Sequence, residues 1–332
     1  MHPRRRGSAL LGLATGLIVA LLSSASANAQ AWLPPKGEAW LSLGYGNLYH
    51  TKHYLGLADP DGTTEVDVGH SRVQSIGLQL GYGITNRLAM SVALPFVFGK
   101  YEGAFPHRVN GVISKLDDGN THGTFQDYRI NLAYQLFNGP IAVSPFATAI
   151  IPSHSYAYFG HAAAGKDLRE YQLGFSAGGR LDRILTGSYA EITYSYAFVE
   201  EVKGIDLNLD RSNLGLVVGY FLTPSLAVRF LGSGYYTHGG VVFRTPGNLP
   251  PELFPYHDQI GKASAVNLGG GVSYVLSGST EVGVSYLRSV YGRAGHKIDH
   301  GLSVGLSWSF SPAQIIRRTS PPRPERLEAP ER

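Results

Sequence analysis

Histidine is the residue type in this sequence best suited to bind a metal ion, and its distribution is uneven. The chain contains 12 histidines, and all but His2 lie in or next to the long connections between predicted strands. They are His50, His53, His70, His107, His122, His154, His161, His238, His257, His296 and His300. A neutral imidazole ligates transition metals and changes charge near neutral pH. No pair has the spacing of a metal motif, although His50 and His53 share one strand end, so the sequence predicts no metal site and no cofactor.

Nucleophilic chemistry has two candidate sequences, and neither is complete. Residues 174–178 read GFSAG, which matches the G-x-S-x-G elbow of serine hydrolases. That elbow needs a strand-to-helix turn, whereas Ser176 falls in the middle of a predicted strand. His154 beside Ser153 or Ser155 offers a second serine–histidine pair, but no third member accompanies it. We therefore predict no catalytic residue, with a lipid-acting barrel enzyme as the rival hypothesis.

Charged side chains recur on predicted strands in one phase, which places them on the same face. Asp127 and Arg129 lie two residues apart and so point the same way. The full set of predicted lumen charges is Asp127, Arg129, Glu170, Arg180, Glu191, Arg211 and Arg229. Across a narrow barrel these charges either stabilise a plugged interior or form a constriction that selects solutes, and the sequence leaves both alternatives open.

The elements that carry these residues have a period of two. In residues 88–98 every second residue is large and apolar, and the residues between are mostly small. A period of two predicts a strand with two unlike faces. About twelve such runs follow one another, and no helical period competes after residue 29. Pro95 falls inside the run at residues 88–98, so we expect a bulge or weakened pairing there, because proline lacks the N–H that a neighbouring strand needs.

The connections alternate strictly between short and long. Short turns are predicted near 84–86, 138–140, 182–187, 223–225 and 277–279, and long loops near 54–71, 102–124, 154–168, 200–210, 237–261 and 293–299. Outer-membrane barrels combine an even strand number, short periplasmic turns and long outer loops. The sequence therefore predicts an all-β, up-and-down antiparallel barrel in the bacterial outer membrane. The alternative interpretation of the same strands is a soluble β-sandwich.

Both ends of the chain differ from the middle. Residues 1–29 combine three arginines, a short apolar run and a small-residue cleavage pattern, which predicts a secretory signal peptide. Removal of its three positive charges would lower the net charge from +4 to +1, and no clustered basic face suggests a nucleic-acid partner. We assign residues 30–310 to the barrel. Residues 311–332 are rich in proline and mixed charges and are expected to form a disordered periplasmic tail.

One long connection is unusually apolar. Residues 237–261 contain several large hydrophobic side chains that need cover in an exposed loop, among them Phe243, Leu253, Phe254 and Tyr256. We expect this loop to fold over or into the barrel mouth and to form an apolar site through which solutes enter.

The stretch ITNRLAMSVALPFVFGKYEG, followed by QDYRINLAYQLFNGPIAVSPFATAIIPS and GFSAGGRLDRILTGSYAEITYSYAF, resembles an outer-membrane barrel family named for the meta-pathway of phenol degradation. The likeness covers residues 38–310, and its D-x-R element corresponds to Asp127, Tyr128 and Arg129. It implies a channel or transporter for small, often aromatic, compounds. Outer-membrane lipid, the assembly machinery that reads an aromatic strand end such as Phe310, and a small solute are the implied partners. A structural or adhesive barrel is a third hypothesis, and the sequence makes no prediction of oligomeric state.

Overall fold

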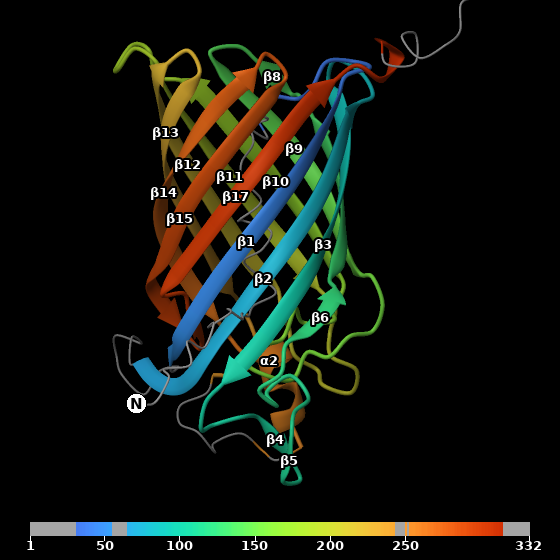
Figure 1. Cartoon of the computed structure of the whole chain (residues 1–332). Helices are drawn as coiled ribbons and strands as arrows, with labels where there is room; N and C mark the ends of the chain where they lie inside the picture. Colours follow the sequence, from blue (N-terminus) through green and yellow to red (C-terminus); the bar gives the residue numbers. More distant parts are fainter. Residues whose placement is uncertain (1–30, 55–64, 243–249, 251, 315–332) are drawn as a thin grey trace, which may run out of the picture.

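A computed structural model describes the chain from the start of the predicted barrel to just beyond its last strand (Figure 1). The described residues are 31–54, 65–242, 250 and 252–314. The predicted signal peptide and all but the first four residues of the predicted tail lie outside them.

Twelve long antiparallel strands close into a barrel, as the sequence predicts (Figure 1). Each strand pairs with its sequence neighbours, and the first and last strands, β1 and β17, pair with each other to complete the ring. The strands are β1 (Ala39–Tyr54), β2 (Glu65–Gly83), β3 (Leu88–Glu102), β7 (Asp127–Tyr134), β9 (Ile141–Pro152), β10 (Glu170–Arg180), β11 (Ser188–Val199), β12 (Arg211–Thr223), β13 (Leu226–Thr237), β14 (Ser264–Ser277), β15 (Thr280–Arg293) and β17 (His300–Phe310).

The large apolar residues of the period-two pattern point outward. In β2, Ile76, Leu78 and Leu80 are each about half exposed, and their cross-strand partners on β1 and β3 lie in the same phase. The residues between them are small or polar and face the interior, where Ser144 and Ser176 are fully buried. An apolar belt around a polar interior suits a hydrocarbon environment and not water, because a soluble protein rarely exposes so large an apolar surface.

The two ends of the barrel differ in the length of their connections. Short turns lie at the upper end in Figure 1, and the long loops gather at the lower end. One short strand, β8 (Phe137–Asn138), belongs to a short connection. Six further short elements belong to the long loops or their edges: β4 (Arg108–Val109), β5 (Val112–Ile113), β6 (His122–Phe125), η1 (Phe254–Tyr256), α2 (His257–Ile260) and β16 (Gly295–Lys297). None of the helices in the described part of the chain is long and apolar enough to cross a membrane.

A register change beside Pro95 confirms the expected irregularity. On one side β3 pairs with β6, with Phe96 opposite Phe125, whereas further along it pairs with β7, with Ala93 opposite Arg129. The two pairings differ by one residue, and the extra residue is accommodated near Gln126, whose N–H donates to the Pro95 carbonyl at 3.0 Å. This bulge precedes β7 and so sets the phase that directs Asp127 and Arg129 into the lumen.

Candidate functional site

One long loop lies inside the barrel. Residues 153–169, between β9 and β10, place Ala162 and Ala164 against the lumen-facing wall residues Val73, Val97 and Tyr101, and all five are buried. A side chain on Gly99 would lie 2.3 Å from the Ala162 carbonyl oxygen, so the wall and the loop backbone meet at a position that only glycine allows. The small residues of the loop therefore let it fold inward and narrow the lumen near the long-loop end.

The inward loop brings a lysine to a buried ion pair. Arg211 at the start of β12 donates through Nη2 to Glu170 Oε2 at 2.5 Å, and both side chains are almost fully buried. Lys166 interacts electrostatically with both, and its ammonium donates to the Gln259 carbonyl of α2 at 3.1 Å. Burial, with a smaller contribution from Arg211, lowers the pKa of Lys166 to about 8. Glu170, Arg211 and Lys166 form a compact charged group that we call the outer charge cluster.

Asp127 and Arg129 extend the outer charge cluster along the wall. Tyr156 of the inward loop donates its hydroxyl to Asp127 Oδ1 at 2.6 Å, and Arg129 interacts electrostatically with both Glu170 and Asp127. Burial and the nearby Asp127 carboxylate raise the pKa of Tyr156, so its hydroxyl remains a donor at physiological pH. The predicted lumen residues of β7, β10 and β12 are thus brought together, with Lys166 and Tyr156 as additional members that the strand pattern did not reveal.

A second charged pair lies closer to the short-turn end. Arg229, near the start of β13, forms an ion pair with Glu281 of β15, and both side chains are largely buried. Glu191 of β11 is also buried in the lumen phase. These residues do not join the outer charge cluster, since their strands place them near the opposite end of the barrel.

Arg180 does not line the lumen, contrary to the sequence prediction. Its guanidinium pairs with the Asp182 carboxylate at 2.6 and 3.2 Å, and its side chain is 65% exposed. The alternation that predicted its direction ends with β10, and the following turn offers Asp182 as the nearer partner. Arg180 therefore belongs to the short-turn rim.

The apolar loop expected at the mouth packs partly on its neighbours. Leu253 and Tyr256 lie against a buried cluster of loop and α2 residues, Leu168, Val202, Leu209 and Ile260. Phe254 remains 37% exposed and contacts Phe159 and His257 through its ring. Phe243 lies outside the described residues. The loop thus joins the inward loop at the mouth, while its role in solute binding remains a prediction.

The segment before β1 lies in the lumen at the short-turn end. The Ala31 carbonyl accepts hydrogen bonds from Gln135 Nε2 at 2.9 Å and Ser144 Oγ at 2.8 Å. A side chain on Gly178 would lie 2.7 Å from the ring of Trp32, so this ring rests on the barrel wall. The strand pattern gave no sign of this segment, because it precedes the first alternating run.

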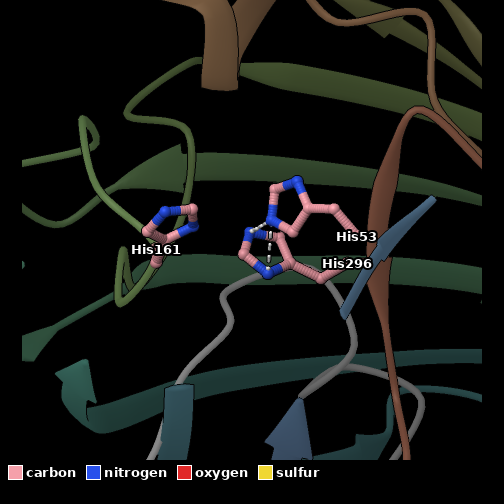
Figure 2. Close-up of side chains that lie close together, drawn as sticks. All are labelled: His53, His161 and His296. Atoms are coloured by element: carbon pink, nitrogen blue, oxygen red, sulfur yellow. Dashed lines mark hydrogen bonds between the residues drawn. The ribbon is translucent and has the colours of Figure 1, made fainter. Parts of the chain in front are cut away.

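Six histidines gather at the long-loop end. Figure 2 shows His53 of β1, His296 of β16 and His161 of the inward loop, with His53 Nε2 lying 3.0 Å and 3.1 Å from the two ring nitrogens of His296. His50 lies beside His296, and His107 connects His161 to His257. Burial is the main cause of two pKa shifts here. It lowers the pKa of His161 to about 4 and the pKa of His296 well below its ordinary value. The imidazoles of His161 and His296 are therefore neutral at physiological pH and able to bind a cation.

Within the part of the chain that the structure describes, no carboxylate is hydrogen-bonded to the histidine in the serine–histidine pair of the rival enzyme hypothesis. Ser153 Oγ lies 2.9 Å from His154 Nδ1, but His154 Nε2 faces the Thr124 hydroxyl at 3.1 Å. A catalytic histidine is oriented by a carboxylate on its far nitrogen. Ser155 donates to Asp167 at 3.0 Å and so does not bond to His154 there. The geometry gives no support to hydrolytic chemistry at this position.

Comparison with known proteins supports the fold. No family model and no curated protein matches the sequence. The COG4313 outer membrane channel from Pseudomonas putida F1 is similar in structure, with a TM-score of 0.62 at 12% identity over 84% of this chain and 98% of that one. The NanC porin aligns with a TM-score of 0.45 at 11% identity over 81% of this chain and 98% of its own. The chain therefore has the barrel fold found among outer-membrane channels.

Proposed function

We propose that the protein is a channel of the bacterial outer membrane that passes small solutes through a narrow, charged constriction. The observation that carries this proposal is the outer charge cluster, which an inward loop completes inside the barrel wall. Buried charges of both signs in a confined lumen act strongly on a passing solute, because the surrounding wall screens them poorly. The apolar outer belt and the predicted signal peptide support the location.

The solute class is a finer part of the proposal. Resemblance to the phenol-pathway barrel family suggests aromatic or apolar compounds, and Phe254 offers an exposed ring at the mouth. The charge cluster favours a solute that also carries a polar group. Simple aromatic acids satisfy both requirements and are the first compounds to test.

Solute flux into liposomes tests the proposal. The purified chain is reconstituted with a graded panel of sugars, amino acids and simple aromatic acids, after gel mobility before and after boiling has verified a folded barrel. We expect flux that falls steeply with solute size and favours the aromatic acids. Absence of flux for the whole panel, with release of fatty acid from the lipid, would contradict the channel and favour the enzyme.

A further inference from the structure

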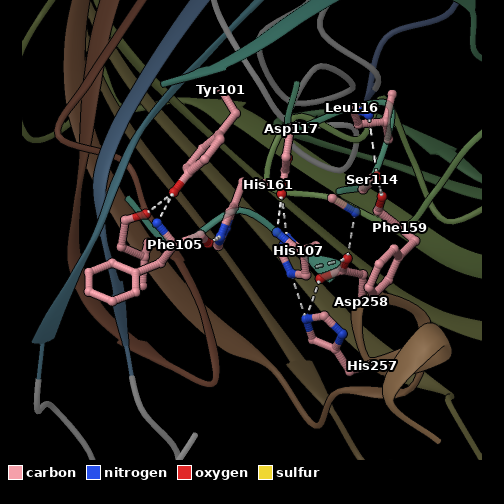
Figure 3. Close-up of polar contacts among 12 residues, drawn as sticks. Tyr101, Phe105, His107, Ser114, Leu116, Asp117, Phe159, His161, His257 and Asp258 are labelled. Atoms are coloured by element: carbon pink, nitrogen blue, oxygen red, sulfur yellow. Dashed lines mark hydrogen bonds and ion pairs between the residues drawn. The ribbon is translucent and has the colours of Figure 1, made fainter. Parts of the chain in front are cut away.

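Polar side chains from three outer loops converge at the barrel mouth. Figure 3 shows His107 from the loop that follows β3, His257 and Asp258 from α2, and His161 from the inward loop. His107 and His257 lie 150 residues apart in the chain, yet their Nε2 atoms are 2.8 Å apart. The fold, and not a local motif, therefore creates this group.

The far nitrogen of each of these two histidines is already bound. His107 Nδ1 lies 2.6 Å from Asp117 Oδ2, and His257 Nδ1 lies 2.9 Å from the Phe254 carbonyl oxygen. Carbonyls and ionised carboxylates only accept hydrogen bonds, so each Nδ1 carries the hydrogen and each neutral Nε2 carries a lone pair. Metal-binding histidines are held in this way, by a carboxylate or a backbone carbonyl on the nitrogen that does not face the metal.

The two lone pairs point into a shared space with a carboxylate. Asp258 Oδ1 lies 3.2 Å from His257 Nε2, and Asp258 Oδ2 lies 3.8 Å from His107 Nε2. The Gly160 N–H donates to Asp258 Oδ2 at 3.0 Å and fixes this side chain. Two nitrogens bound to one tetrahedral zinc ion lie about 3.3 Å apart, given zinc–nitrogen distances of about 2.0 to 2.1 Å. A shift of a few tenths of an ångström would therefore admit the ion.

A proton between the two histidines is the alternative occupant. Burial lowers the pKa of His107, but the carboxylates of Asp258 and Asp117 outweigh it, and the net shift is upward. A shared proton therefore accounts for the 2.8 Å approach without a metal. In the described structure, unpartnered acceptors on the other side of His107 favour the larger positive charge of a divalent ion over that of a proton.

Two buried polar atoms beside His107 lack a partner among the residues that the structure describes. They are His161 Nδ1 and Asp117 Oδ1, and both side chains are more than nine-tenths buried. His161 Nε2 donates to the Phe105 carbonyl at 3.1 Å, so its Nδ1 carries a lone pair. Ligand atoms of His107, Asp117 and His161 lie within 4.8 Å of one another. Unsatisfied buried acceptors are costly, and a cation nearby would stabilise them.

We propose that a divalent transition-metal ion, with zinc the best match, binds between His107, His257 and Asp258 at the outer mouth. Two imidazoles and a carboxylate form a ligand set that zinc accepts, with a fourth position open to water or a solute. Asp117 acts as a positioning residue that orients His107. Because its ligands come from different loops, the ion joins the loop after β3 to α2 across the mouth. This inference does not depend on the proposed transport.

The neighbouring histidines do not form an equivalent site. His53 Nε2 is almost equally distant from both nitrogens of the His296 ring. It therefore faces the side of that ring that lies between its two nitrogens, and the lone pairs of the two rings do not converge on one point. His296 is instead a useful comparison, because it is close to the proposed site without belonging to it.

Calorimetric zinc titration of the folded full-length chain in detergent, after removal of metal by chelation, tests the site. We expect one zinc ion per chain for the wild type and none for H257Q. D117N should bind about 10- to 100-fold more weakly, as expected for loss of an orienting carboxylate. H122Q is the matched control, because His122 is a loop histidine that pairs only with Asp118 at 2.9 Å in the described structure and lies outside the group. Cobalt substitution should give the absorption of a tetrahedral site.

Gel mobility before and after boiling verifies that each variant is folded. Wild-type protein that binds no stoichiometric zinc would overturn the proposal and leave the shared proton as the explanation. Zinc binding that survives in H257Q but disappears in H296Q would place the ion among the other histidines and overturn it equally.

Discussion

The two ends of the lumen are narrowed by different means. At the long-loop end an internal loop folds inward and is held by buried charges, with Lys166 reaching Glu170 and Arg211. At the short-turn end the segment before β1 enters the lumen and is held by neutral hydrogen bonds to the Ala31 carbonyl. If the proposed channel function holds, the inward loop and its charges would select solutes by charge, whereas the segment before β1 would restrict passage by size.

The largest expected effect comes from removal of the inward loop. Replacing residues 155–167 with a short Gly-Ser linker should raise single-channel conductance several-fold, because Ala162, Ala164 and Lys166 no longer occupy the lumen. Planar-bilayer recording measures the change. Replacing residues 183–185 of a short turn in the same way is the control and should leave conductance unaltered. Equal conductance for the two variants would show that the loop does not narrow the path.

A pair of arginine variants separates the lumen from the rim. R211Q removes a buried positive charge from the outer charge cluster, so the reversal potential in a salt gradient should move toward greater cation selectivity. R180Q removes an exposed charge of the same type, whose ion pair with Asp182 is surrounded by solvent, and should leave the reversal potential unchanged. A similar shift in both variants would contradict the placement of Arg180 at the rim.

Removal of the ring that narrows the short-turn end should have a weaker effect. W32A removes the ring that rests on Gly178 and should raise conductance by less than loss of the inward loop, with no change in ion selectivity. W308A is the matched control, because Trp308 is 40% exposed on the lipid-facing surface of β17. Conductance that changes as much in W308A as in W32A would rule out a specific role for the segment before β1.

The smallest predicted effect is a dependence on pH. The pKa of Lys166 is lowered to about 8, mainly by burial, so Lys166 is mostly charged at pH 7 and mostly neutral at pH 9. Loss of this positive charge should make the channel slightly more cation-selective as the pH rises. Reversal potentials at the two pH values measure this shift, and K166Q should abolish it. A shift of equal size in K166Q would assign the titration to another group.

The barrel itself was predictable from sequence, because a period of two and alternating connection lengths are local properties. Ile76, Leu78 and Leu80 face outward as predicted, and the expected irregularity at Pro95 is present. The alternation along each strand correctly predicted that the side chains of Asp127, Arg129, Glu170 and Arg211 face the lumen. The same alternation gave the wrong position for the Arg180 side chain. Arg180 is the last residue of its strand, where the backbone no longer fixes the side-chain direction and Asp182 is a nearer partner.

The contributions of the loops could not be predicted in the same way. Lys166 and Tyr156 belong to a loop without periodicity, and its place inside the barrel is evident only from structural contacts such as the close approach of Ala162 to Gly99. The run of small residues at 162–165 was the available signal. His107 and His257 are likewise brought together by loop packing over 150 residues of chain, which no local spacing rule detects.

The central claim is that the lumen is a conducting, water-filled path, and two neighbouring residues of β7 test it most directly. The chain has no cysteine, so N131C and I130C each introduce a single reactive thiol. Asn131 lies in the lumen-facing phase, whereas Ile130 is 41% exposed on the lipid-facing side. We predict that a water-soluble thiol reagent lowers the ion current through N131C and does not alter that through I130C. A current through N131C that persists unchanged after complete labelling, or the absence of any current in the unlabelled proteins, would contradict the account.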